Sequence, residues 1–491
     1  MQTFVKSFTL LLTVALLTTW TGIANSQSTE LKIPITTSAP EAKALYEQAR
    51  DLQEKFHFPE SREPLEAALK LDENFALAHW LYAFTQPSNK GFLEELGKAV
   101  SLVDQVSEGE RLIILAQQAG ISGDQLQQGD YLLTLIEKYP QDERAQTALA
   151  LFYFGQQRYQ DAVVHFNEAT EANPAFSPAY NMLGYSYRAL EQYNEAEQAF
   201  KKYTELLPNE ANPLDSYAEL LFKMGRYDEA LAAYRKTLEL DATFINSFVG
   251  IASVLTCMDR HAEALEELQQ MMAAAVNDGQ RRFALTSMAN VDCDEGKFDD
   301  ALRVVDEQYA IAEKINDVGA LAQDLNFMGN ILFETGRYDE ALAKFTASIE
   351  LVRASNLGAD IKANSERFYL FNEALVALKQ GDAETAQAKS MEFTEKAEAA
   401  HNTFQIWLSH QLAGMIALDA GAFAKALAEF QNANPQNPHN LYRMALAYKG
   451  LGELDKAKEY AMKAADFNGL LALNYAFARP QAKALLAELP K

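Results

Sequence analysis

The sequence predicts an all-α solenoid made of stacked helix pairs. Pro140, Pro174 and Pro208 follow one another at intervals of 34 residues, and a fixed period of this length indicates stacked helical repeats. Large residues recur three to four positions apart within each unit, which marks one apolar face on each helix. A single helix pair has too little core of its own, so each pair must bury its apolar face against its neighbours.

The same residue types return at matching positions in successive units. The central unit has Leu183, Gly184, Tyr187, Tyr193, Ala196 and Phe200, and the preceding unit has Leu149, Ala150, Tyr153, Tyr159, Ala162 and Phe166. The pattern appears again at Tyr217, Ala218, Leu221, Tyr227, Ala230 and Tyr234, and later at Met328, Gly329, Leu332, Tyr338, Ala341 and Phe345. Four units therefore agree in register.

Small residues in this pattern predict where helices approach closely. A glycine inside a helix costs about 1 kcal/mol relative to alanine, so Gly184 and Gly329 are expected at tight helix–helix contacts. The sequence GRYDEA, at 225–230 and again at 336–341, is expected to join the two helices of a pair. Its glycine would end the first helix and its aspartate would begin the second.

These residues resemble the tetratricopeptide repeat (TPR) family, closely between Glu143 and Ala242 and again at 322–350. The resemblance implies a right-handed superhelical solenoid of about twelve helix pairs, with C-terminal capping helices. In TPR proteins, the first helices of successive units line a concave groove, which often holds an extended peptide or a partner helix.

The first 26 residues are predicted to be a signal peptide. Lys6 precedes an apolar run at 8–17, and Ala24-Asn25-Ser26 fits a small-x-small cleavage site. The apolar run is shorter than the ~20 residues that a membrane span needs. No cysteine lies near the cleavage site, so a lipoprotein is not expected. We therefore expect an exported protein, periplasmic or secreted, with no membrane span after cleavage; an uncleaved anchor is the alternative.

The remaining chain divides by the regularity of its repeat. The predicted parts are a polar leader at 27–40, degenerate units at 41–142, regular 34-residue units at 143–280, longer units at 281–468 and capping helices at 469–491. Ser107 and Glu110 have the spacing of a capping box, in which each side chain bonds the backbone amide of the other. An added helical turn per pair accounts for the longer period of the later units.

Composition and motifs favour binding over catalysis. The formal net charge of −25 argues against binding to nucleic acid or to anionic membranes. The sequence has no zinc-binding cysteine or histidine pair, no nucleophile elbow and no glycine-rich phosphate loop. Its two cysteines, Cys257 and Cys293, are expected to be idle thiols, with a disulfide as the alternative. We therefore predict no enzyme activity, no cofactor and no metal.

The concave groove is the predicted binding site, with a protein or peptide as the partner. Mapped from the TPR resemblance, its lining includes Asn181, Tyr185, Arg188, Asp215, Glu219, Lys223, Asn246, Ser253, Asn290, Asn326 and Asn330. Asparagine recurs there, and its amide can both donate to and accept from a peptide backbone. The leading hypothesis is a scaffold or adaptor of the bacterial cell envelope. The alternative is a soluble receptor for a small molecule or glycan, stacked on Tyr185, Phe154 or Phe333.

Overall fold

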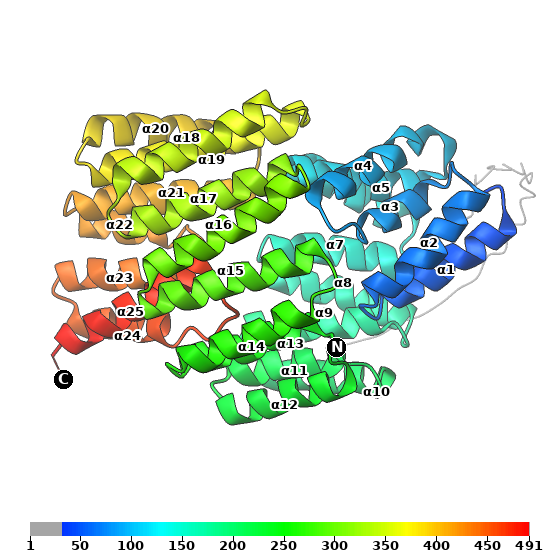
Figure 1. Ribbon diagram of the computed structural model, residues 1–491, viewed down its shortest axis with the longest axis horizontal. Coiled ribbons are helices and arrows are strands. Elements are labelled where there is room, and N and C mark those ends of the chain that lie inside the picture. Colours follow the sequence, from blue (N-terminus) through cyan, green and yellow to red (C-terminus); the bar gives the residue numbers. More distant parts are fainter. Residues whose placement is uncertain (1–31, 491) are drawn as a thin grey trace, which may run out of the picture.

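The computed structural model describes residues 32–490, which form 25 α-helices and one 3-10 helix and contain no strand. The helices follow one another as a continuous stack of pairs (Figure 1). The all-α solenoid predicted from the sequence is therefore confirmed. The predicted signal peptide lies outside the described residues, as do the first residues of the predicted leader.

The helices have the following bounds. The degenerate units contain α1 (Pro40–Gln53), α2 (Phe58–Leu71), α3 (Ala76–Ala83), α4 (Asn89–Ser101), the 3-10 helix η1 (Val103–Gln105), α5 (Glu108–Ser122) and α6 (Gln125–Lys138). The regular units contain α7 (Glu143–Gly155), α8 (Tyr159–Ala172), α9 (Ser177–Ala189), α10 (Tyr193–Leu206), α11 (Asn212–Lys223), α12 (Tyr227–Leu240), α13 (Ile245–Cys257) and α14 (His261–Ala274).

The second half of the chain begins with longer helices. It contains α15 (Asp278–Glu295), α16 (Phe298–Lys314), α17 (Val318–Glu334), α18 (Tyr338–Ala354), α19 (Ala359–Lys379), α20 (Ala383–Ala399), α21 (Thr403–Asp419), α22 (Phe423–Phe430), α23 (Pro438–Gly450), α24 (Leu454–Ala465) and α25 (Leu473–Glu488). Whereas α13 and α14 have 13 and 14 residues, α17 and α18 have 17 each. Each helix of the pair is thus longer by about one turn, where one added turn per pair was predicted, and the added residues explain the longer period.

Helices α1 to α24 form twelve consecutive pairs, as predicted, and each pair packs on the next. After the last pair the structure has one helix, α25, where several capping helices were predicted. Residues 466–472 before it are not helical, and they contain Asn468 and Gly469, which are poor helix formers. The expected capping box is present, because Ser107 accepts from the Glu110 amide and Glu110 from the Ser107 amide.

The predicted close approaches of helices are also present. A Cβ atom placed on Gly184 would lie 2.5 Å from the ring of Phe200, and one on Gly329 would lie 2.5 Å from the ring of Phe345. These distances leave no room for a side chain, so the glycines let the two helices of a pair close around an aromatic ring.

The turn between paired helices differs in one detail from the prediction. Gly225 ends α11 with a positive φ of 74°, which glycine adopts without strain. Arg226, and not Asp228, is the residue that precedes the first turn of α12. Asp228 lies within that turn, where its negative charge interacts favourably with the positive end of the helix dipole.

The superhelix brings distant units into contact. The backbone amide of Asn89 at the start of α4 donates to Asp317 Oδ2, 2.9 Å away at the start of α17. The amide of Thr403 on α21 donates to Gln125 Oε1 of α6 at 2.8 Å. The first and later units therefore lie side by side (Figure 1), and the concave surface is not a single open groove.

The chain covers part of its own concave surface. Residues 466–479, here called the C-terminal strap, cross from α24 to helices of the regular units. The amide of Leu471 donates to Ser253 Oγ at 3.0 Å, and Tyr227 donates to Asn468 Oδ1 at 2.7 Å. Helix α25 then packs against both α15 and α23, as the red helix behind α15 shows in Figure 1. The concave surface of α11, α13 and α15 is thus partly filled by the strap.

The N-terminal leader forms neither helix nor strand over its described residues 32–39. The amide of Ile33 donates to Asp142 Oδ2 at 2.9 Å, and that of Thr36 donates to Glu110 Oε1 at 2.7 Å. The ends of the helices therefore hold this segment by its main chain.

Both cysteines are free thiols. Burial raises the pKa of Cys257 to about 11 and that of Cys293 to about 12, so neither is a reactive thiolate at neutral pH. In the part of the chain that the structure describes, no helix combines the length and the apolar character that crossing a membrane requires.

Candidate functional site

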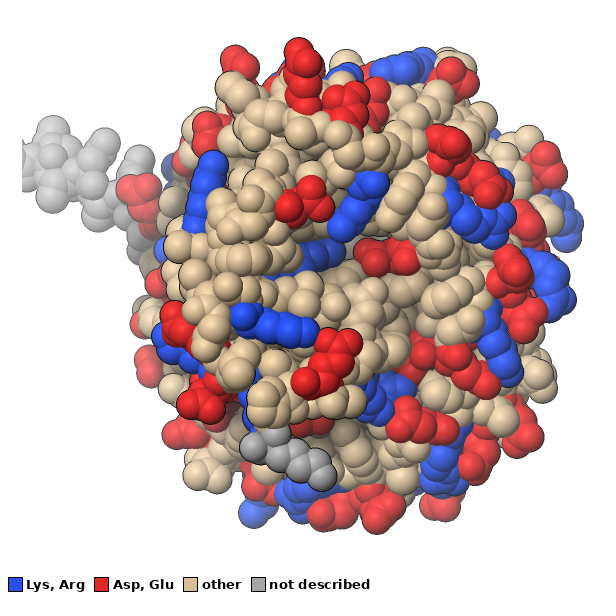
Figure 2. All heavy atoms as spheres, turned by 90° about the vertical axis from the view of Figure 1, so that its left-hand side faces the viewer, with Lys and Arg blue, Asp and Glu red and all other residues tan. Residues whose placement is uncertain are grey.

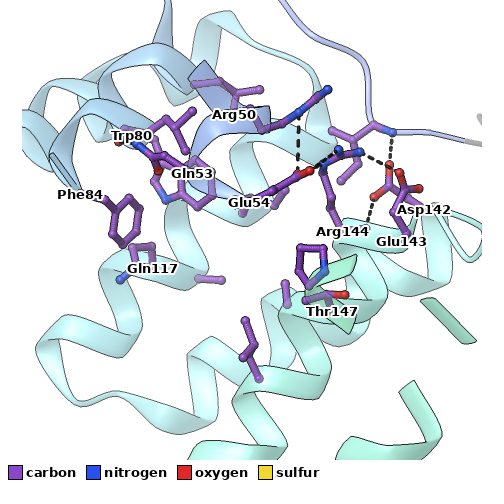
Figure 3. A pocket seen from close by; sticks show the side chains of 18 of the residues that line it. Arg50, Gln53, Glu54, Trp80, Phe84, Gln117, Asp142, Glu143, Arg144 and Thr147 are labelled. Carbon is purple, nitrogen blue, oxygen red and sulfur yellow. Dashed lines mark hydrogen bonds and ion pairs between the residues drawn. The ribbon is translucent and has the colours of Figure 1, made fainter. Parts of the chain in front are cut away.

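A large pocket lies on the concave side of the N-terminal units. Its volume is about 1070 Å³, and its walls come mainly from α1, α3, α5, α7 and α9. These are the first helices of five successive pairs, whose inward residues recur three to four positions apart and therefore share one face. Figure 3 shows this N-terminal pocket, with Trp80, Phe84 and Gln117 on one side and Arg144 on the other.

Apolar side chains without a covering partner form much of the wall. Phe56 is 38% exposed, Phe84 is 37% exposed and Leu151 is 45% exposed. Phe84 packs edge-on against Trp80, with 5.5 Å between the ring centroids. Large apolar side chains gathered in one concavity typically mark a binding surface. This wall is suited to an apolar or aromatic group.

Several charged side chains of the pocket are paired with one another. Arg144 donates to both carboxylate oxygens of Glu54, at 2.7 and 3.1 Å, and to Glu143 at 2.7 Å. Burial alone would lower the pKa of Arg144, but the charges of Glu54 and Glu143 outweigh it, so the pKa is raised. Burial likewise favours a higher pKa for Glu143, yet the hydrogen bond from Lys32 helps to bring it below its ordinary value. Arg144, Glu54 and Glu143 therefore balance one another's charge within the pocket wall.

Several buried polar atoms in the pocket wall have no hydrogen-bond partner. Among the described residues seven buried side-chain atoms lack a partner, and four of them belong to lining residues. They are Arg50 Nε, Trp80 Nε1, Thr147 Oγ1 and Asn181 Oδ1. Because an unsatisfied buried polar atom costs about 1–3 kcal/mol, a bound molecule that supplied partners would be favoured.

The sequence-predicted site residues lie in several places. Tyr185 donates to Glu219 Oε1 at 3.0 Å, and Arg188 donates to Glu219 Oε2 at 2.9 Å. Ser247 donates to the buried Asp215 at 2.6 Å. These groups lie close together, as predicted, but their partners come from the chain itself. Their role in ligand binding stays a prediction.

Two more of these predicted site residues contact the C-terminal strap. Lys223 Nζ lies 3.9 Å from the ring centroid of Phe467, and Ser253 accepts from Leu471. Burial lowers the pKa of Lys223 to about 8, which weakens it as a permanent cation for a ligand. The strap therefore occupies the part of the groove where a peptide was predicted to lie.

The asparagines predicted to line one groove are not brought together. Asn181 lines the N-terminal pocket, Asn246 is exposed, and Asn290 is 3% exposed. Asn326 donates to Ser348 Oγ at 2.7 Å, and Asn330 lines a separate cavity among the C-terminal units. They therefore do not form the continuous amide row that a peptide backbone would follow.

The aromatic residues proposed for a glycan are packed against their neighbours. Phe154 lies edge-on to Tyr159 with 5.2 Å between the centroids, and Tyr185 lies edge-on to Phe200 at 5.3 Å. Phe333 is 6% exposed. Stacking on a sugar requires an open ring face, and these rings are engaged within the fold.

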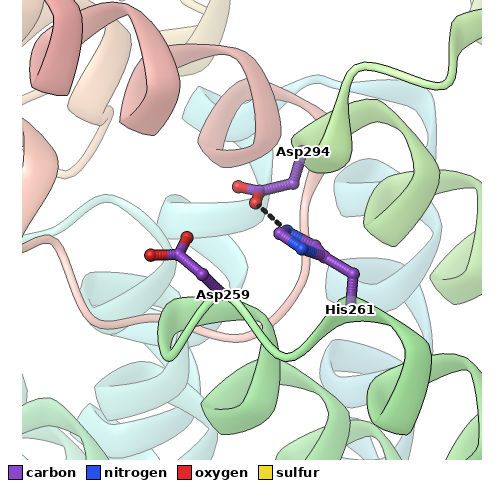
Figure 4. A group of neighbouring side chains, drawn as sticks. All are labelled: Asp259, His261 and Asp294. Carbon is purple, nitrogen blue, oxygen red and sulfur yellow. Dashed lines mark hydrogen bonds and ion pairs between the residues drawn. The ribbon is translucent and has the colours of Figure 1, made fainter.

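One group of side chains has the composition of a metal site. Asp259, His261 and Asp294 place their possible ligand atoms within 4.8 Å of one another, the single such group among the described residues (Figure 4). Arg479 forms salt bridges to both aspartates, and Lys483 lies 3.0 Å from Asp259 Oδ2. The positive charge that a metal ion would supply is already present, so this group is best explained as an ion-pair network.

Sequence reasoning missed the N-terminal pocket because its units depart from the repeat pattern. Trp80 and Phe84 lie in the irregular unit before the helix-breaking segment 86–91. An aromatic residue on a first helix could have indicated an inward-facing position, but aromatic residues are equally typical of core positions. The available signal was the loss of the regular pattern itself.

Comparisons with known proteins identify the repeat. Models of the tetratricopeptide repeat match residues 280–354, 165–198, 143–176, 214–244 and 438–469. A search of curated proteins found no similar sequence. Among solved structures, a tetratricopeptide repeat protein from Parabacteroides merdae ATCC 43184 is 16% identical and aligns over 59% of this chain and 100% of its own, with a TM-score of 0.36. The MamA protein is 17% identical and aligns over 34% of this chain and 91% of its own, with a TM-score of 0.28.

The matched segments extend from the first regular unit to the last helix pair. Four of the five cover one or two helix pairs of the structure, and the segment 165–198 runs across two neighbouring pairs. On these grounds the chain contains tetratricopeptide repeats.

Proposed function

We propose that this protein is a non-enzymatic scaffold or adaptor, whose N-terminal pocket holds an extended, apolar segment of a protein partner. Tetratricopeptide repeats generally mediate protein–protein interactions or scaffolding. The observation that carries the proposal is the set of exposed apolar side chains, including Phe56, Phe84 and Leu151, gathered inside one concave pocket.

Two further observations support a polypeptide as the occupant. The leader already lies beside the pocket, held by its main-chain amides at Ile33 and Thr36. In addition, Arg144 is neutralised by Glu54 and Glu143, so an uncharged apolar segment that lies against Arg144 meets no unpaired charge there. A segment of this kind would bury the open wall of the pocket, and burial contributes roughly 25 cal/mol per Å² of apolar surface.

Selection from a displayed library of random peptides tests this proposal. We expect the enriched peptides to be rich in apolar and aromatic side chains. Trp80→Ala should weaken the binding of a selected peptide by roughly 30- to 1,000-fold, because truncating a buried aromatic anchor costs about 2–4 kcal/mol. Affinities would be measured by titration calorimetry with the purified protein.

A matched pair of aspartate variants provides the control. Leu151 lines the pocket and is 45% exposed, whereas Leu133 is 47% exposed and does not line it. Leu151→Asp should abolish peptide binding, and Leu133→Asp should leave it unchanged. If both variants bind the selected peptides as the natural protein does, the peptides bind elsewhere and the proposed site is wrong.

A small apolar molecule is the second candidate ligand, because the volume of about 1070 Å³ lies at the upper end of the range for small-molecule pockets. If no peptide is selected but an apolar dye binds and is lost in Trp80→Ala, this candidate replaces the first.

We also propose that the protein is exported, either to the periplasm or into the medium. Lys6, the apolar run at 8–17 and the small residues before Gln27 support this proposal. N-terminal sequencing of the protein from fractionated cells should give Gln27 as the first residue. Ala24→Arg should prevent the cleavage, because the position requires a small side chain. A natural protein that begins at Met1 in the membrane fraction would favour an uncleaved anchor.

A further inference from the structure

A second cavity lies on the concave side of the C-terminal units. Its volume is about 460 Å³, and it shares no lining residue with the N-terminal pocket. Its walls come from α17, α19, α21 and α23, and α25 closes it with Leu473 and Phe477. We call it the C-terminal chamber. Figure 2 shows the end of the molecule formed by these units, which is hollowed near its centre and has basic and acidic side chains on the rim of the hollow.

Arg443 is a buried cation in this chamber without a carboxylate partner. It is 9% exposed, and its one hydrogen bond among the described residues runs from Nη1 to Asn440 Oδ1 at 3.3 Å. Arg479 is equally buried, at 8% exposed, but it forms a two-pronged salt bridge with Asp294. Burial lowers the pKa of Arg443 in spite of the attraction of Glu334. A buried guanidinium of this kind is a ready partner for a carboxylate.

Glu334 is the complementary group in the same chamber. Among the described residues, the closest basic group to it is His439, whose Nδ1 lies 3.8 Å from Glu334 Oε1. Burial lowers the pKa of His439 well below its ordinary value, so the imidazole is neutral at pH 7. Burial also raises the pKa of Glu334, although the charges of Arg443 and Lys379 and a hydrogen bond with Gln481 act in the opposite direction. The chamber thus contains one acid and one base that form no salt bridge with each other.

The rest of the wall is suited to an apolar body. Phe371, Trp407 and Phe477 line the chamber, and aromatic faces bind apolar or ring-shaped groups. Gln411 accepts a hydrogen bond from Asn437 through its Oε1 atom, at 3.2 Å, which leaves its amide NH₂ as a donor toward the chamber. The volume is within the range of pockets that hold one small molecule.

We propose that the C-terminal chamber binds a free α-amino acid with an aromatic or apolar side chain. Its carboxylate would accept hydrogen bonds from Arg443, its ammonium group would face Glu334, and its side chain would lie against Trp407. Only a zwitterion places an opposite charge beside both groups at once. A dianion such as phosphate would be repelled by Glu334, and a simple carboxylic acid would leave that group without a cation.

Titration calorimetry with the full-length protein tests this inference, with L-phenylalanine and L-leucine as probes. Phenylpropanoate lacks the ammonium group and phenethylamine lacks the carboxylate, so each should bind the natural protein more weakly than L-phenylalanine. Arg443→Met should weaken amino-acid binding by roughly 10- to 100-fold, the loss expected for a hydrogen bond to a charged group. Glu334→Gln should remove the preference for L-phenylalanine over phenylpropanoate.

Lys449→Met is the matched control, because Lys449 is on the same helix, does not line the chamber and pairs with Glu488 in an exposed ion pair. It should bind both amino acids as the natural protein does. Circular dichroism would verify the fold of each variant; if Arg443→Met does not fold, Trp407→Ala and Glu334→Gln provide the test. The inference is overturned if neither amino acid binds, if phenylpropanoate binds the natural protein as tightly as L-phenylalanine, or if the chamber variants bind unchanged.

Discussion

Arg479→Met is expected to lower the free energy of unfolding by about 3–5 kcal/mol, because it removes the guanidinium from a buried carboxylate, which then keeps only its contact with His261. Arg479 Nε lies 2.9 Å from Asp294 Oδ2, and the Asp294 side chain is 4% exposed. The same guanidinium donates to the carbonyl of Cys257 at 3.2 Å. It therefore joins α25 to both α13 and α15, and its loss should also loosen the C-terminal strap.

Urea unfolding followed by circular dichroism measures this effect, and hydrogen exchange across residues 466–479 measures the loosening of the strap. Arg303→Met provides the control, because Arg303 is 75% exposed and pairs with Asp300 on the surface. Such a pair contributes about 0–1 kcal/mol. A double variant, Arg479→Met with Asp294→Leu, should recover most of the lost stability, since an apolar pair of similar volume often replaces a buried ion pair without loss. A loss below about 1 kcal/mol in the single variant would contradict this account.

The parts of the fold that were predictable from sequence are those set by local packing. Gly184 and Phe200 lie in the same repeat unit. The glycine that leaves space and the aromatic residue that fills it therefore occur together in the sequence. The lengthened units were also predictable, because the period directly reflects the lengths of the two helices. Each of these features depends on residues within one unit or its immediate neighbour.

The closure of the superhelix was not predictable in the same way, because it depends on small rotations that accumulate over many units. The salt bridge between Arg479 and Asp294 joins residues 185 positions apart, and no repeat pattern relates them. The predicted polar set shows the same limit. The sequence places Tyr185 and Glu219 on inward-facing first helices, but it does not show that their side chains bond each other and that the strap covers neighbouring residues.

Asp215 should make the protein less stable as the pH rises from about 6 to 8. Burial, together with the charge of Glu219, raises the pKa of Asp215 to about 8, although the hydrogen bond from Ser247 acts in the opposite direction. An unfolded aspartate titrates near pH 3.9. Between these values the folded chain holds one more proton at this site than the unfolded chain, so stability falls with rising pH. The contribution is complete below the unfolded pKa and is lost as the pH rises through the folded pKa.

The expected slope is about 1.4 kcal/mol per pH unit within this window. Asp215→Asn keeps the oxygen that accepts from Ser247 but removes the titrating group. The free energy of unfolding of this variant, relative to that of the natural protein, should therefore increase by roughly 2–3 kcal/mol between pH 6 and 8. Urea unfolding at several pH values measures this difference. Asn246→Ser changes an exposed, uncharged side chain on the neighbouring helix. The free energy of unfolding of this control variant should vary with pH in parallel with that of the natural protein. If the stability of Asp215→Asn changes with pH in parallel as well, the carboxyl is ionised in the folded state and this account of Asp215 is wrong.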